Sequence, residues 1–133
     1  MIANEEKILE WDDEAKILKI RREPIRKIVL EKACEYEKKC KDELIKLGIE
    51  IKENIINEGH IAFLTEFFAR YIHEVLLETF GEKGTYLLYS EKGRELLIKE
   101  LNEMFERKLR EYLDKAGEEV IKKEIGKIKS TIN

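Results

Sequence analysis

The chain has 133 residues, enough for one domain over residues 1–133 with its own core, and 43% of them are hydrophobic and 41% charged. The net charge of −3 excludes the strongly charged, weakly hydrophobic composition of disordered chains and a general attraction to nucleic acid or anionic membranes. No apolar run reaches the roughly 20 residues of a membrane span and the acidic N-terminus lacks a signal-peptide core, so we expect a cytoplasmic protein without membrane contact.

Residues 7–20 predict an N-terminal β-hairpin. Two short β-prone runs, Lys-Ile-Leu-Glu-Trp and Lys-Ile-Leu-Lys-Ile, flank the acidic, turn-like segment Asp-Asp-Glu-Ala. A helix is the competing interpretation. Four apolar residues of this segment also recur at helical spacing, namely Ile8, Trp11, Ala15 and Leu18. Because an isolated hairpin is only marginally stable in water, this one must pack on the helices or pair with another chain.

A long amphipathic helix is predicted for residues 24–47. Pro24 suits the first turn of a helix, where its missing N–H group is not needed. Apolar residues then form one stripe over about six turns. The stripe consists of Ile25, Val29, Ala33, Tyr36, Cys40, Leu44 and Leu47. Gly48 follows as the residue expected to end the helix.

The most apolar segment is residues 60–80, which we predict to be a second long helix ended by Gly81 and Gly84. Its apolar residues are Ile61, Phe63, Leu64, Phe67, Phe68, Tyr71, Ile72, Val75, Leu76, Leu77 and Phe80. A helix this apolar is buried on more than one side, at the centre of a bundle or in a subunit interface. Residues 49–58 are predicted as a shorter helix that bends or breaks near Gly59.

The C-terminal part is predicted to be helical after a short apolar connector at residues 85–89. Ser90 has a suitable N-cap side chain and starts a helix over residues 90–116. Gly117 is a weak point, and residues 118–132 carry isoleucines at helical spacing that either extend this helix or form a fourth. The predicted fold is therefore a mostly α-helical bundle of three or four helices with an N-terminal β-hairpin.

The aromatic residues of the segment 60–80 have three interpretations. The first is an ordinary hydrophobic core. The second is a subunit interface formed by Phe63, Phe67, Phe68 and Tyr71, because excess apolar surface in a small helical domain is most simply covered by another copy. The third is a small-molecule pocket lined by Phe63, Phe67 and Tyr71.

A basic cluster within residues 16–27 is the main candidate for nucleic-acid contact. Lys19, Arg21, Arg22 and Arg26 would meet backbone phosphates if they faced outward together. Glutamates lie among them and no stacking aromatic residues are interleaved. Ion pairing with these glutamates is therefore the ordinary alternative.

The candidates for catalysis lie on the polar side of the Phe-rich helix. His60 and His73 are the two histidines. Arg70 and His73 are candidates for a phosphate-handling pair, and a small helical hydrolase or nuclease would use both together with Glu74. The alternative is a solvated strip of ion pairs, because Arg70, Glu74 and Glu78 recur at intervals of four residues.

No pattern predicts a metal ion or another cofactor. The sequence lacks the Glu-x-x-His motifs of di-metal bundle sites and the spacing of a phosphate-binding glycine loop. Cys34 and Cys40 fall in the middle of a helix, far from a helix N-terminus that would lower a thiol pKa. We predict both to be buried, small apolar side chains.

The charged residues also suggest heat adaptation. Glutamate far outnumbers aspartate, lysine outnumbers arginine, and glutamine is absent. Proteins of hyperthermophiles are enriched in Glu and Lys and depleted in heat-labile amides. The composition therefore predicts a thermophilic source, which concerns stability rather than function.

These observations give three functional hypotheses from different classes. The first is a non-enzymatic interaction or assembly module that forms a homodimer through the Phe-rich helix. The second is a nucleic-acid-binding accessory protein that uses the basic cluster, and the third is the small hydrolase or nuclease. The excess apolar surface and the scarcity of catalytic residue patterns favour the first.

Overall fold

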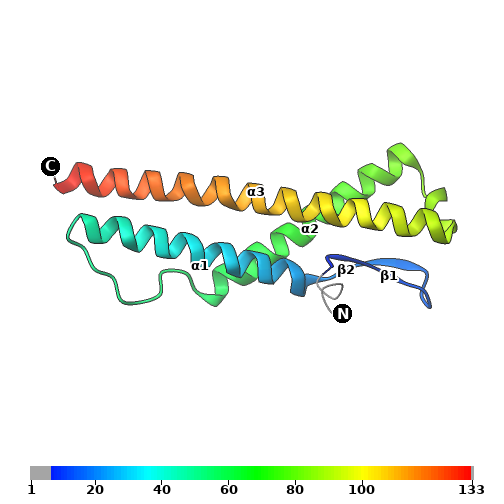
Figure 1. The fold of residues 1–133 in the computed structure, drawn as a ribbon, viewed down its shortest axis with the longest axis horizontal. Helices are drawn as coiled ribbons and strands as arrows, with labels where there is room; N and C mark the ends of the chain where they lie inside the picture. The colour runs from blue at the N-terminus through cyan, green and yellow to red at the C-terminus, as the bar shows by residue number, and fades with distance from the viewer. Residues whose placement is uncertain (1–6, 133) are drawn as a thin grey trace.

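The computed structural model describes residues 7–132, and its mostly helical fold with an N-terminal hairpin confirms the predicted fold class (Figure 1). The elements in chain order are β1 (Leu9–Asp12), β2 (Ile17–Ile20), α1 (Arg22–Lys46), α2 (Glu58–Lys83), the 3-10 helix η2 (Tyr86–Tyr89) and α3 (Glu91–Ile132). Three long helices, rather than four, therefore account for the helical part of the described chain.

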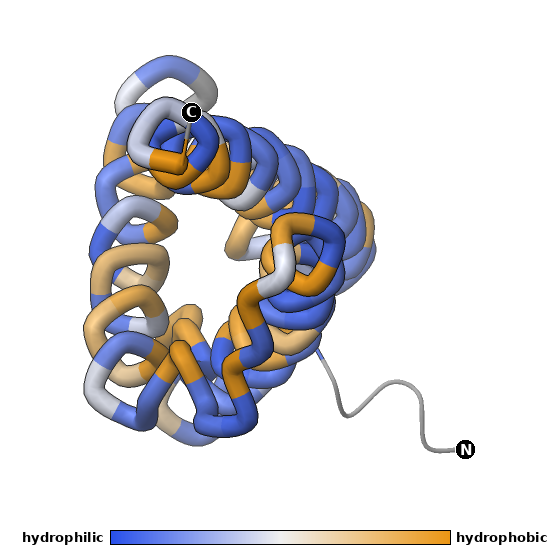
Figure 2. Tube along the Cα trace, turned by 90° about the vertical axis from the view of Figure 1, so that its left-hand side faces the viewer, coloured by the Kyte–Doolittle hydropathy of each residue, from blue (hydrophilic) through white to orange (hydrophobic). Residues whose placement is uncertain are grey.

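The three long helices enclose one core. α3 runs along the whole molecule, α1 lies parallel to its C-terminal half, and α2 crosses in the opposite direction (Figure 1). Viewed along the long axis, the helices surround a common interior, and hydrophobic positions lie along the inner sides of the tube (Figure 2). The largest fully buried side chains come from the hairpin, α1 and α3, and are Phe105, Leu9, Ile25 and Val29.

The hairpin forms because two short strands pair in register and a side chain closes the turn between them. β1 and β2 are antiparallel, with Leu9 opposite Ile20. The Asp12 carboxylate accepts hydrogen bonds of 3.0 Å from the backbone N–H groups of Glu14 and Ala15. This local turn chemistry favours chain reversal over the competing helix.

Asn102 of α3 fastens the hairpin to the helices. The backbone N–H of Leu9 donates to Asn102 Oδ1 at 2.8 Å, and Asn102 Nδ2 donates to the Leu9 carbonyl at 3.1 Å. The amide side chain therefore pairs with the outer edge of β1 as a neighbouring strand would. Both residues are buried, so these hydrogen bonds satisfy backbone groups that water does not reach.

The short helix predicted at residues 49–58 is wrong, because the chain is irregular until α2 begins. Gly48 leaves α1 at φ +83, in the left-handed region. The backbone N–H groups of Ile55 and Ile56 then donate to the Glu37 carboxylate at 2.7 and 2.8 Å, and these bonds lower the pKa of Glu37. A carboxylate on α1 thus replaces the hydrogen bonds that a helix would supply.

α2 ends three residues later than predicted, at the second of the two glycines expected to end it, while α3 begins after Ser90 as predicted. α2 continues through Gly81 and reaches Lys83, because the next residue, Gly84, has φ +78. After η2, the hydroxyl oxygen of Ser90 accepts a hydrogen bond from the N–H of Gly93 at 3.2 Å. Ser90 therefore caps α3, as its side chain predicts.

α3 passes Gly117 without a break and includes the whole segment 118–132. Gly117 marks a close approach between α1 and α3 rather than a weak point. A Cβ atom built on Gly117 would lie 2.6 Å from Cγ of Tyr36, well inside van der Waals contact. The glycine therefore leaves the space that the ring of Tyr36 fills.

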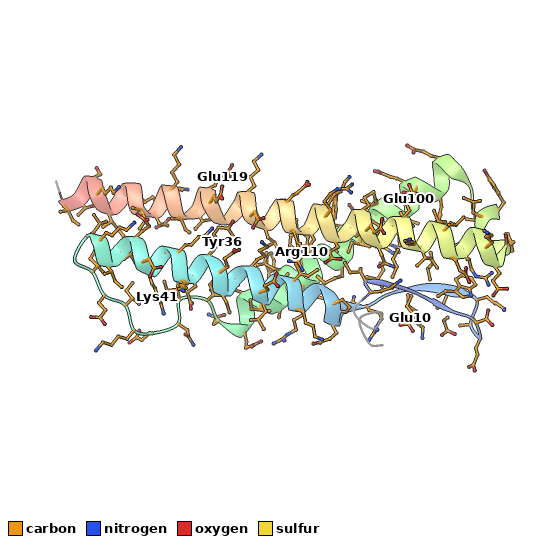
Figure 3. All side chains as sticks on the ribbon, in the orientation of Figure 1. Glu10, Tyr36, Lys41, Glu100, Arg110 and Glu119 are labelled. Atoms are coloured by element: carbon orange, nitrogen blue, oxygen red, sulfur yellow. The ribbon has the colours of Figure 1, made fainter. Side chains whose placement is uncertain are left out.

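Tyr36 lies between α1 and α3 (Figure 3) and also makes polar contacts there. Its hydroxyl donates to Asp114 Oδ1 at 3.0 Å, and Nζ of Lys32 lies 2.8 Å from the same oxygen. Nζ of Lys39 lies 4.6 Å from the ring centroid. Burial of the hydroxyl, together with the hydrogen bond to Asp114, raises the pKa of Tyr36 from 10.0 to about 12.

This pKa predicts a loss of stability in alkali that depends on Tyr36. Between pH 10 and 12 the unfolded chain releases the tyrosine proton while folded Tyr36 retains it. The contribution to the free energy of unfolding is therefore complete below pH 10 and is lost as the pH rises through 12. Chemical unfolding at several pH values measures it. The stability of Tyr36→Phe should fall less steeply over this interval than that of the wild type, and equal slopes would contradict the assignment.

Candidate interaction surface on helix α2

The outer side of α2 exposes aromatic side chains that a folded monomer leaves in contact with water. Phe63 is 69% exposed, Phe67 46% and Tyr71 39%, and Tyr112 of α3 beside them is 51% exposed. We call these four residues the aromatic face. Phe68, which we assigned to the same surface, is only 3% exposed and belongs to the core.

The aromatic face is continuous across two helices. The ring centroids of Phe63 and Phe67 are 6.5 Å apart, and those of Phe67 and Tyr112 are 6.4 Å apart. Buried Phe68 meets both Phe67 and Tyr112 edge to face at 5.3 Å and so fixes their positions from below. The exposed rings therefore stand on a packed support, which lowers the conformational entropy lost when a partner covers them.

Tyr112 is the part of this surface that the sequence pattern missed. Its spacing from Phe105 and Leu109 places it near an apolar stripe of α3, where an inward position would be expected. The next residue, Leu113, takes that inward position and is buried. Leu113 lies among Val29 and Ala33 of α1, whereas Tyr112 lies beside Phe67 and Phe68 of α2.

A shallow groove of about 460 Å³ runs between α2 and α3 beside the aromatic face. Its floor is apolar, and Lys108, Glu111 and Lys115 stand among its lining residues. Phe67 and Tyr71 line this groove but Phe63 does not, so the three residues predicted to form a small-molecule pocket do not line one groove together. The groove extends the apolar surface and surrounds it with charges, as in the polar rim of an interface.

The catalytic candidates are brought only partly together. Arg70 and His73 line a shallow depression against β2, with Arg22 and Glu66 in the same lining, whereas Glu74 is not part of it. Within the described chain, no hydrogen bond or ion pair joins His73 to a carboxylate. The arrangement needed for a positioned base is therefore incomplete in this depression.

The basic cluster is neutralised by neighbouring carboxylates. Four ion pairs bridge it, at the distances 2.8 Å for Lys19–Asp12, 3.5 Å for Arg21–Glu10, 3.2 Å for Arg22–Glu66 and 2.9 Å for Arg26–Glu58. The bonds to Asp12 raise the pKa of Lys19, and those to Glu66 raise the pKa of Arg22. Two of these pairs, Lys19–Asp12 and Arg21–Glu10, lie within the hairpin segment, and the other two join α1 to α2, which matches the ion-pairing alternative.

The two cysteines differ from each other. Cys34 is exposed, so its predicted burial is wrong, while Cys40 is half-buried and its burial raises the pKa of the thiol. Among residues 7–132, no group of three or more His, Cys, Asp or Glu side chains is placed to hold a metal ion. No helix in this part of the chain combines the length and apolar character needed to cross a membrane.

Comparison with known proteins identifies no relative of this chain. The sequence matches no protein-family model, and neither the curated proteins nor the solved structures give a significant match. Function is therefore argued from the surface itself.

Proposed function

We propose that this protein is a non-enzymatic assembly module that forms a homodimer through the aromatic face on α2 and α3. The observation that carries the proposal is the exposure of Phe63, Phe67, Tyr71 and Tyr112 in one continuous surface. Contiguous apolar surface of this kind, rimmed by charges, marks interaction sites in soluble proteins. Rigidly supported aromatic side chains are also the residues that contribute most to binding in protein interfaces.

The competing hypotheses have less support. A nucleic acid would have to displace four carboxylates from Lys19, Arg21, Arg22 and Arg26, which offsets part of the gain from its phosphates. Hydrolysis would need a carboxylate that positions His73 as a base. The depression that His73 lines does not include the expected Glu74. The aromatic face requires only a complementary apolar surface. Every other copy of the chain carries such a surface.

Self-association should depend on the aromatic face. Sedimentation equilibrium over about 1–100 μM should give a dimer for the wild type, and Phe63→Ser should raise the dissociation constant at least about tenfold, because a buried aromatic ring is lost from the interface. Phe63 is suited to this test because it is 69% exposed, so its replacement leaves the core intact.

Leu96→Ala is the matched control, because Leu96 is 59% exposed on α3 outside the aromatic face. It should leave the dissociation constant unchanged, and circular dichroism should show native helicity in both variants. A wild type that stays monomeric at the highest concentration would overturn the proposed function. Equal effects of the two substitutions would place the interface elsewhere.

A further inference from the structure

The outermost ridge of α2 has a regular composition that goes beyond its apolar character. Six exposed positions lie on the side opposite the core, at intervals of four, three, four, three and four residues. We call these positions the α2 seam, which consists of Phe63, Phe67, Arg70, Glu74, Leu77 and Gly81. Alternating steps of three and four residues characterise the contact line between two paired helices.

The intervals of the α2 seam read the same from either end, with Ile72 at the midpoint. If a second α2 packs antiparallel across a two-fold axis at this midpoint, positions equally distant from it meet. Phe67 then lies opposite the partner's Leu77, and Arg70 lies opposite the partner's Glu74. Each contact occurs twice because a two-fold interface is reciprocal.

We propose that the occupant of the α2 seam is a second copy of this chain, packed antiparallel, with two reciprocal ion pairs between Arg70 and the partner's Glu74. This inference rests on the proposed self-association and adds its direction and register. The seam covers 19 residues, and the 18 helical steps between its first and last positions correspond to about 27 Å of helix.

The charges support the antiparallel direction. In a parallel pair, Arg70 would face the partner's Arg70, and Glu74 would face the partner's Glu74, so both contacts would be repulsive. Within residues 7–132, neither side chain has an ion-pair partner in its own chain, since Glu66 pairs with Arg22 instead. Both charges are therefore available to a partner without first breaking a bond.

The two ends of the seam are sterically matched. Phe63, the most exposed of the seam's aromatic rings, would lie opposite the partner's Gly81. A Cβ atom built on Gly81 meets nothing within 4 Å, so the surface there is open. A large ring opposite an open glycine lets the helices approach closely without a clash, as in knobs-into-holes packing.

The length of α2 supports the register. An antiparallel register centred near residue 65 would stack Phe63 on the partner's Phe67. It would also carry Glu74 and Leu77 past the start of the partner's α2 at Glu58. Leu77, which is 61% exposed, would then remain uncovered. The register centred on Ile72 covers the whole seam.

Charge reversal tests this inference. Arg70→Glu and Glu74→Arg should each weaken the homodimer at least about tenfold, because two attractive contacts become repulsive. Mixing the two variants should restore dimers near the wild-type affinity, since a heterodimer again places opposite charges face to face. Sedimentation equilibrium of each variant and of their equimolar mixture measures this.

The matched control uses the same residue types at the same spacing on α3. Arg107→Glu and Glu103→Arg reverse exposed charges four residues apart outside the seam, so neither they nor their mixture should change the dissociation constant. Circular dichroism checks that every variant folds.

Disulfide formation gives an independent geometric test. In a Cys34→Ser, Cys40→Ser background, equimolar Arg70→Cys and Glu74→Cys chains should oxidise mainly to the mixed 70–74 disulfide, because paired Cα atoms must lie within about 7 Å. Predominant 70–70 and 74–74 disulfides, or a mixture of charge variants that does not recover, would overturn the antiparallel register. If the dimer nonetheless needs Phe63, the proposed function stands. A wild type that stays monomeric would contradict both the proposed function and the antiparallel register.

Discussion

Replacing Asn102 with leucine should lower the free energy of unfolding by about 3 kcal/mol, because the buried N–H and C=O groups of Leu9 would both lose their partner. Leucine is similar in size to asparagine and is common at buried positions, so α3 itself would accommodate it. The expected loss comes instead from the backbone of a strand 93 residues earlier in the sequence. Chemical unfolding monitored by circular dichroism measures the change.

The matched control is Glu103→Leu, the same new side chain at the next, exposed position of α3. This substitution should change stability by no more than about 0.5 kcal/mol. Trp11, the only tryptophan, reports the hairpin directly because the Arg94 guanidinium lies 4.7 Å from its ring centroid. Its fluorescence should shift in Asn102→Leu and not in Glu103→Leu. A stability of Asn102→Leu within error of the wild type would show that the hairpin docks without this pair of bonds.

Replacing Gly117 with alanine should destabilise the protein by about 1–3 kcal/mol, although alanine is the better helix former by about 1 kcal/mol. The added Cβ would overlap the ring of Tyr36, which is buried and held at its hydroxyl by Asp114. The ring cannot move aside without breaking that hydrogen bond or separating α1 from α3. Overlap with a fixed aromatic ring therefore outweighs the gain in helix propensity.

Gly126→Ala provides the opposite result on the same helix. A Cβ atom at Gly126 meets nothing within 4 Å, so this substitution should stabilise the protein by up to about 1 kcal/mol. Thermal and chemical unfolding of both variants should give changes of opposite sign. The double variant Tyr36→Ala, Gly117→Ala should recover part of the Gly117→Ala loss, since the two effects share one contact. Additive effects would show that Gly117 acts through the helix backbone and not through Tyr36.

The aromatic face shows how far the sequence pattern leads toward a candidate site. The abundance of apolar residues in α2 predicts a surface that exceeds the need of one core, and Phe63, Phe67 and Tyr71 are indeed exposed. The pattern does not separate Phe67 from Phe68, because adjacent residues on so apolar a helix are equally suited to burial. The direction from which α1 and α3 approach α2 separates them, and the same packing turns Tyr112 outward.

Local sequence patterns predict the three main helical segments and the cap at Ser90, and they favour the hairpin over the competing helix, because strand pairing, amphipathic spacing and capping act between residues close in the chain. Contacts between distant parts of the chain account for the features that these patterns miss. The irregular loop before α2 follows from the Glu37 carboxylate, the uninterrupted α3 from the fit of Gly117 against Tyr36, and the docking of the hairpin from Asn102. Each of these depends on a partner far away in the sequence, and local periodicity carries no information about which distant group completes a contact.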